Sequence, residues 1–177
     1  MSGLPPIRPA SPGDATAIAE IKVAAWRTAY RRIVPDAVLD GLRVEDVRDH
    51  WLAVRQSELA EQGIVASEQD CLVGYALFGP ARHQVEDFDG QLFELYVLPS
   101  HFGSGLAARL LDAALARLKA AGYSGVMLRV FEANARARRF YEKHRWTRIQ
   151  DAELYDEIGG ARLLTIAYGF HVVNTLK

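Results

Sequence analysis

The spacing of hydrophobic residues changes several times along the chain, and each change indicates a different secondary-structure element. Over residues 105–121, leucines and alanines recur at steps of three and four, which places them on one face of a helix. Residues 72–78 are apolar at nearly every position, as in a central strand buried on both faces. The pattern predicts strands at 4–9, 63–68, 72–78, 91–97, 125–131, 146–158 and 161–170, and helices at 11–30, 44–59, 105–121 and 134–144.

The order and the joints of these elements predict the fold class. Turn-forming residues at 69–70 and 159–160 join two antiparallel hairpins, whereas the strand-helix-strand unit over 91–131 requires a locally parallel pair. The other joints are expected to be a break at 31–36, a strand end at 79–80 and a polar surface loop at 83–90. We therefore expect one α/β domain over residues 1–177, with a mixed, mostly antiparallel sheet, a central parallel strand pair and flanking helices.

Composition narrows the function classes. Half of the 177 residues are hydrophobic and 24% are charged, which is the balance of an ordinary soluble globular protein. The net charge of -1 gives no general attraction to nucleic acid or to a membrane surface. The single cysteine, Cys71, rules out an internal disulfide framework, and we expect a buried structural thiol because it heads an apolar run. Because no signal pattern and no apolar run of membrane-spanning length occur, a cytoplasmic protein is expected.

A small-residue loop connects the strand at 91–97 to the helix at 105–121. At a helix N-terminus several backbone N–H groups have no intrahelical partner and the helix dipole is positive. The loop residues Gly103, Ser104, Gly105 and Ala107 leave room for a bulky anion, so the loop is a candidate phosphate or pyrophosphate cradle. The alternative is a packed strand-helix junction in which glycine only relieves crowding. The loop lacks the third glycine of a dinucleotide fingerprint and the Lys-Ser/Thr of a P-loop.

A second candidate element is the predicted helix at 134–144. Asn134 and Tyr141 are seven residues apart, which is two helical turns, so both lie on one face and can line a groove. The alternative assigns Asn134 to an N-cap and Tyr141 to packing.

These two segments resemble the motifs of the GCN5-related N-acetyltransferases. Gly105-Leu106-Ala107 matches the second half of the family's Gln/Arg-x-x-Gly-x-Gly/Ala motif, while Phe102 departs from its first position. The family signature Asn-x-x-Ala-x-x-Phe-Tyr-x-Lys-x-Gly-Phe is matched at Asn134, Ala137, Phe140, Tyr141 and Lys143, with Arg145 and Trp146 as departures. The element order is also similar over nearly the whole chain, which implies the acyl-CoA N-acyltransferase fold.

The resemblance implies an enzyme that moves an acetyl group directly from the thioester of acetyl-CoA to a primary amine of a small molecule or a peptide. It implies that the cofactor's pyrophosphate binds the loop mainly through backbone amides, and that a backbone N–H on the preceding strand receives the oxyanion. It further implies that Asn134 binds the pantetheine arm and that Tyr141, near the thioester sulfur, is the general acid. The implied cofactor-binding residues are Leu95, Tyr96, Val97, Phe102, Gly103, Ser104, Gly105, Leu106, Ala107 and Asn134. A homodimer is a frequent habit of the family, and the oligomeric state stays open.

Three further side chains are candidates because of their positions. Glu94 interrupts a nearly apolar strand and shares a face with Tyr96, so it is the expected base, acting through water. A solvated or structurally paired glutamate is the alternative. The resemblance implies that Trp26 and Tyr30 wall the acceptor site, although aromatic residues at helical spacing also occur in cores. The histidines and the single cysteine show no metal-ligand spacing, so no metal is expected.

Two other function classes compete with this interpretation. One is a non-catalytic acyl-CoA-binding or sensing module on the same fold, which the departure at Phe102 keeps open. The other is a nucleotide-binding α/β protein that uses the glycine loop for ATP or NAD, against which the missing third glycine and P-loop lysine argue.

Overall fold

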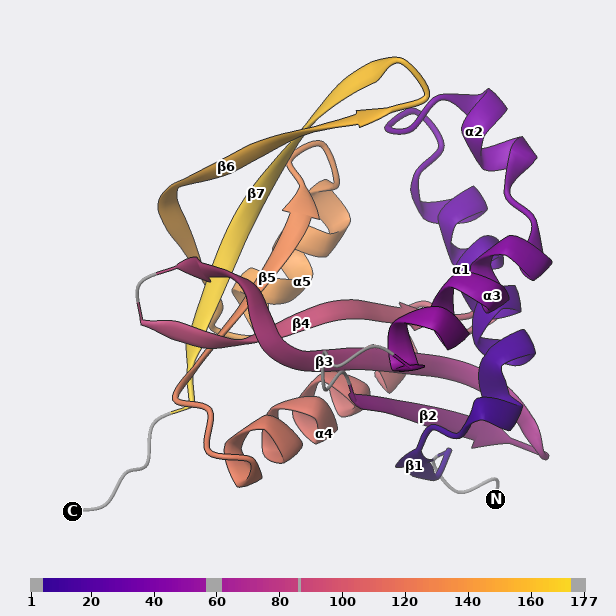
Figure 1. Ribbon diagram of the computed structural model, residues 1–177, viewed down its shortest axis with the longest axis horizontal. Coiled ribbons are helices and arrows are strands. Elements are labelled where there is room, and N and C mark those ends of the chain that lie inside the picture. Colours follow the sequence, from indigo (N-terminus) through magenta and orange to yellow (C-terminus); the bar gives the residue numbers. More distant parts are fainter. Residues whose placement is uncertain (1–4, 57–61, 86, 173–177) are drawn as a thin grey trace.

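The computed structural model describes residues 5–56, 62–85 and 87–172, and in them the strands form one twisted sheet that helices cover (Figure 1). The strand order is β1-β2-β3-β4-β5-β7-β6. The strands are β1 (Ile7–Pro9), β2 (Gln62–Glu68), β3 (Cys71–Val85), β4 (Phe88–Val97), β5 (Gly125–Phe131), β6 (Thr147–Ile158) and β7 (Ala161–His171). The α-helices are α1 (Ala15–Ala29), α2 (Asp36–Gly41), α3 (Val44–Gln56), α4 (Leu106–Ala120) and α5 (Ala135–Lys143), and 3-10 turns cover Pro12–Asp14 and Pro99–His101.

The pairing between β4 and β5 is parallel, and it is short. Gly90–Leu92 pairs with Val126–Leu128, while the other neighbouring strands pair antiparallel. Past Leu92 the described parts of the two strands have no further pairs, and Figure 1 shows β5 leaving with β7 while β4 continues beside β3. A register shift on the β3 side, at Phe93, coincides with the divergence. The sheet therefore opens at its centre.

The helices cover the two faces of the sheet with separate apolar clusters. On one face α4 buries Leu110, Leu111 and Leu118, and α5 packs against the same cluster through Phe140 and Tyr141. Each fully buried leucine contributes about 1.5–3 kcal/mol to the folded state. On the other face α1 and α3 bury residues that pack on Val65 and Tyr75, namely Ile18, Ile21 and Trp51. The opening between β4 and β5 lies between these two layers.

The structure confirms the predicted fold class, the central parallel pair and both hairpins, and it corrects several local expectations. β3 runs through Gly79-Pro80 to Val85, and β4 begins at Phe88, so the expected loop at 83–90 is largely strand. Pro80 is tolerated because the ladder is irregular between Pro80 and Val85. The expected break at 31–36 ends at Pro35, because the short helix α2 starts at Asp36. The expected helical residues 57–59 lie outside the described residues.

Cys71 is exposed, which corrects the expectation of a buried thiol. It pairs with Glu68 at the end of the β2–β3 hairpin, beside the Gln69-Asp70 turn, before β3 enters the core. The apolar run of β3 therefore starts with Cys71 at the surface, before the strand enters the core.

The start of α1 is fastened to β1 by one carboxylate. Both oxygens of Asp14 accept hydrogen bonds from the Arg8 guanidinium, at 2.8 and 2.7 Å, and one oxygen also accepts from the Ser11 backbone N–H at 2.7 Å. The Asp14 side chain is only 10% exposed. These bonds favour the charged carboxylate and hold the pKa of Asp14 well below its usual range. They fix the start of the helix that carries the candidate residues Trp26 and Tyr30.

We expect Asp14→Asn to flatten the acid sensitivity of folding. Because the folded-state pKa of Asp14 is lowered, its stabilisation is complete above the unfolded-state pKa of about 4 and is lost as the pH falls toward the folded value. Urea unfolding at pH 5 and pH 3 measures this, and the variant should lose less stability between the two pH values than the parent. Asp112→Asn, which changes an exposed carboxylate on α4, is the matched control. An equal loss in Asp14→Asn and parent would contradict the assignment.

Candidate active site

A cavity of about 670 Å³ occupies the opening between β4 and β5. Its walls come from α1, β4, the loop before α4, β5 and α5. The predicted site residues that line it are Trp26, Tyr30, Glu94, Leu95, Tyr96, Val97, Phe102, Gly103, Gly105, Ala107, Asn134 and Tyr141. Ser104 and Leu106 do not: the Ser104 hydroxyl is bonded to the His101 carbonyl oxygen at 2.7 Å, and Leu106 is buried in the core. Residues that are far apart in the sequence thus meet in one place.

The loop before α4 presents open backbone to the cavity. Gly103 and Gly105 adopt left-handed backbone, with φ of +77° and +85°, and no atom lies within 4 Å of where their Cβ atoms would be. Such backbone angles favour glycine, and they turn the chain sharply into α4. In the described residues, the N–H groups of Ala107 and Ala108 have no acceptor, and both residues line the cavity. The first turn of α4 carries no acidic side chain, so this end of the cavity can accept an anion.

Asn134 combines the two roles that the sequence left as alternatives. It is the N-cap of α5, because its Oδ1 accepts a hydrogen bond from the Ala137 N–H at 3.1 Å. It is also buried and lines the cavity. Its amide nitrogen has no acceptor among the described residues and remains available as a donor.

Tyr141 lies on the same helix, two turns after Asn134, and its ring packs against aromatic neighbours. Its ring centroid is 5.8 Å from that of Trp146 and 6.5 Å from that of Tyr168. No hydrogen-bond partner of its hydroxyl occurs in the described part of the chain. Burial, with a smaller contribution from Tyr30, raises the pKa of Tyr141 above its usual value, so the hydroxyl stays protonated and able to donate.

The α1 wall contains a cluster of neutral hydrogen-bonding groups. The Trp26 indole N–H donates to the Tyr96 hydroxyl at 3.0 Å, and the hydroxyls of Tyr30 and Tyr96 share a hydrogen bond of 3.3 Å. The Tyr30 ring also packs edge-on against Phe131 of β5, at 5.2 Å between centroids. Tyr30 therefore contacts both diverging strands, β4 through Tyr96 and β5 through Phe131. Burial is the main reason that the pKa values of Tyr30 and Tyr96 are raised.

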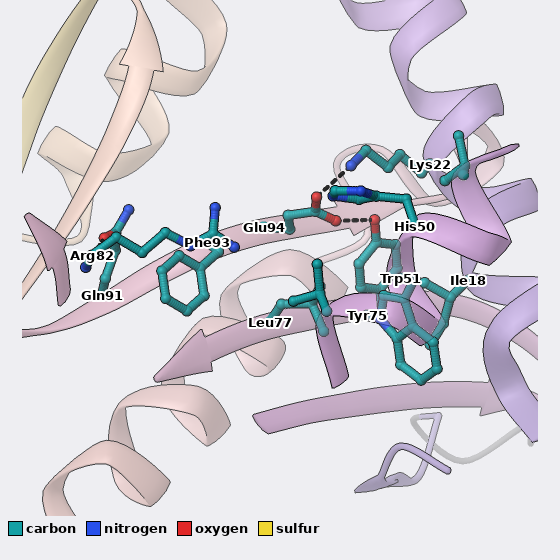
Figure 2. Close-up of a pocket in the computed structure, with 12 residues that line it drawn as sticks. Ile18, Lys22, His50, Trp51, Tyr75, Leu77, Arg82, Gln91, Phe93 and Glu94 are labelled. Carbon is teal, nitrogen blue, oxygen red and sulfur yellow. Dashed lines mark hydrogen bonds and ion pairs between the residues drawn. The ribbon is translucent and has the colours of Figure 1, made fainter. Parts of the chain in front are cut away.

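Glu94 points to the same side of β4 as Tyr96, as strand alternation predicts, and it is paired (Figure 2). One carboxylate oxygen pairs with the Lys22 ammonium, and the other accepts a 2.6 Å hydrogen bond from the Tyr75 hydroxyl. The side chains of Lys22 and Glu94 are each 20% exposed. Of the alternatives left open by the sequence, the structure shows a paired carboxylate, and that carboxylate also lines the main cavity.

Lys22 was missed by the sequence reasoning, although a signal was present. Lys22, Trp26 and Tyr30 follow one another at steps of four, so they form one stripe along α1. All three side chains reach β4 residues: Lys22 reaches Glu94, and the other two reach Tyr96. The stripe is visible in the sequence, but its partners on a strand some 70 residues away are not.

Glu94 also lines a second cavity of about 130 Å³, whose residues are drawn in Figure 2. Phe93 and Glu94 line both cavities. The second cavity also has polar walls, since Lys22, His50 and Arg82 contribute to it and Arg82 stacks over the Phe93 ring at 4.3 Å. The Glu94 side chain is therefore accessible from both cavities.

Within the ranges that the structure describes, no group of three or more metal-ligating side chains could hold a metal ion. None of the described helices has the length and the apolar character needed to cross a membrane.

Comparisons with known proteins agree with this geometry. Residues 21–145 match the Acetyltransferase (GNAT) family. The chain is 30% identical over 171 residues to the uncharacterized N-acetyltransferase YuaI of Bacillus subtilis (strain 168), covering 97% of this chain and 95% of YuaI.

Solved structures share the fold. The structure of yncA from Salmonella typhimurium with its cofactor acetyl-CoA matches with a TM-score of 0.71 at 24% identity, covering 99% of this chain and 98% of that one. The paiA N-acetyltransferase from Thermoplasma acidophilum, in complex with coenzyme A, matches with a TM-score of 0.69 at 20% identity, covering 94% and 98%. Because the family match spans most of the chain and the YuaI alignment nearly all of it, this protein belongs to the GCN5-related (GNAT) acetyltransferase family and is an N-acetyltransferase with acetyl-CoA as its donor.

Proposed function

We propose that this enzyme transfers the acetyl group directly from acetyl-CoA to a primary amine of a small molecule or a peptide, without a covalent enzyme intermediate. The observation that carries the proposal is the composition of one cavity. A protonated phenol without a partner in the described chain, Tyr141, and a paired carboxylate, Glu94, line the same space beside a loop with free backbone N–H groups.

The donor would lie along the open side of β4. Its pyrophosphate would bind the Phe102–Ala107 loop, where the free N–H of Ala107 faces the cavity. Its pantetheine arm would follow residues 95–97 of β4, which lie beyond Leu92, where the pairing with β5 ends. Backbone groups there are free to bind amides of the arm, and the unused amide nitrogen of Asn134 would donate to a pantetheine carbonyl.

The reaction needs three groups: a hydrogen-bond donor for the oxyanion, a proton donor for the leaving thiolate and a proton acceptor for the amine. The neutral amine attacks the thioester carbonyl carbon, and the oxyanion that forms is stabilised by a backbone N–H of Leu95–Val97. The carbon–sulfur bond then breaks, and Tyr141 gives its proton to the leaving thiolate. The proton lost by the amine passes through water to Glu94, which Lys22 and Tyr75 hold in place. Trp26 and Tyr30 would form the wall against which the acceptor packs.

We further propose that residues 1–177 act as one catalytic domain. The cytoplasm is the proposed compartment, because a single exposed thiol suits a reducing environment.

Replacing Tyr141 by phenylalanine should lower kcat by about 10²–10³-fold, because the ring packing is kept and the proton donor is lost. The measurement is thiol release from acetyl-CoA with a panel of amino acids, polyamines, aminoglycosides and peptides, together with calorimetric titration of acetyl-CoA. We expect the Kd to change by less than about threefold. Tyr155→Phe, at an exposed position on β6, is the matched control. A variant with parental kcat would refute the acid role. A parent that binds acetyl-CoA but acetylates no amine would favour the sensing module.

Replacing Glu94 by glutamine should lower kcat/KM by about 10²-fold, because the carboxylate that receives the proton of the amine through water is lost. Lys22→Met is the informative comparison, since it breaks the same ion pair but keeps the carboxylate. If Glu94 only pairs with Lys22 for structural reasons, both variants should lose the same factor in kcat/KM. If Glu94 is the base, Lys22→Met should lose much less than the roughly 10²-fold of Glu94→Gln. Thermal unfolding of both variants controls for loss of folding.

A further inference from the structure

Phe102 occupies the first motif position, where a glutamine or arginine is expected, and its side chain cannot bind an anion. The structure nevertheless brings a cation to this place. The guanidinium carbon of Arg136 lies over the Phe102 ring, 4.0 Å from its centroid. Both residues line the cavity of about 670 Å³, next to Gly103 and Gly105.

The position of Arg136 is not explained by the stability of its own helix. It stands in the first turn of α5, directly after the Asn134 cap and Ala135, where a positive charge opposes the helix dipole. Among the described residues it has no ion pair. Arg138, two residues further along the same helix, bonds the Glu132 carbonyl oxygen at 3.0 Å and its carboxylate at 3.3 Å. A residue that breaks a local preference without local compensation marks a functional position.

Stacking on Phe102 orients the guanidinium without using its hydrogen bonds. A cation over an aromatic face is held by the ring's negative face, so the N–H groups around the edge stay free. A guanidinium binds phosphate oxygens through two parallel N–H bonds, which makes it well suited to a diphosphate. The diphosphate is an anionic part of the donor, and the free N–H groups of Ala107 and Ala108 lie at this end of the cavity.

We infer that Arg136, oriented by the face of Phe102, is the side chain that binds the diphosphate of acetyl-CoA in this enzyme. Arg136 replaces, from α5, the polar side chain that is missing at position 102. Phe102 is then a positioning residue. The inference rests on the donor placement of the proposed function and adds a binding residue to it.

The test is calorimetric titration of the purified full chain with coenzyme A, dephospho-coenzyme A and pantetheine. Arg136→Gln should weaken the binding of both nucleotide ligands by the same factor, about tenfold for a lost charge-assisted contact, and leave pantetheine binding unchanged. The affinity of the variant should also fall less steeply with added KCl. Arg139→Gln, which makes the same change at an exposed position of α5 outside the cavity, should match the parent.

Other outcomes of this titration overturn the inference. A loss confined to coenzyme A would assign Arg136 to the 3′-phosphate, which dephospho-coenzyme A lacks. Equal affinity of parent and Arg136→Gln would show that the arginine binds no part of the donor. In both cases the proposed function stands, because the parent still binds. Failure of the parent to bind any of these ligands would sink the proposed function itself.

A relocated cation separates a binding role from a structural one. The double variant Phe102→Arg with Arg136→Gln carries the guanidinium on the loop and should recover the affinity to within about threefold of the parent. Phe102→Leu alone, which removes the platform but keeps Arg136, should weaken binding by about two- to fivefold. If the double variant binds as weakly as Arg136→Gln while its Tm equals that of the parent, the inference that Arg136 replaces the missing polar side chain of position 102 is wrong.

Discussion

The early end of the β4–β5 ladder is the constraint on which the site depends. Two neighbouring strands that start in register would normally continue to pair, because unpaired backbone in a protein interior is costly. Here the pairing stops after Leu92, and the ladder on the β3 side shifts at the same point, beside Phe93. The closed end is fixed by Asp89, whose carboxylate accepts hydrogen bonds from the N–H groups of Ser124 and Gly125, each at 3.0 Å. The strands are thus tied at one end and apart at the other.

The space that opens there is lined by groups with different electrical characters. The tyrosine hydroxyls on its walls are neutral, since burial keeps those of Tyr30, Tyr96 and Tyr141 protonated over the working pH range. The charge of Glu94 is balanced by Lys22. At the end near α4, Arg136 contributes a cation, and no acidic side chain stands in the first turn of either α4 or α5. Such an arrangement favours a ligand that is anionic at one end and carries a neutral reacting group, as a thioester does.

The sequence predicts correctly which local segments lie at the cavity. Left-handed glycines before an amphipathic helix and an Asn–Tyr pair at two-turn spacing are properties of short segments, and both segments lie at the cavity. Prediction from the sequence fails where one residue finds its partner through the fold. Nothing near Lys22 indicates that it pairs with Glu94, 72 residues away. The exposure of Cys71 has the same origin, because the pattern shows an apolar run but not where the run enters the core.

The departure at Phe102 shows why a motif and a site are different objects. In the sequence, the loop FGSGLA at residues 102–107 lacks the polar side chain expected at its first position. In space that lack is met by α5, because Asn134 caps the helix and thereby directs the first turn, with Arg136, toward the Phe102 ring. Recognition of a diphosphate requires charge and N–H groups at defined positions, and it is indifferent to which segment supplies them. A phenylalanine is then no defect in the loop, because its flat face is the surface on which a cation from another element can be held.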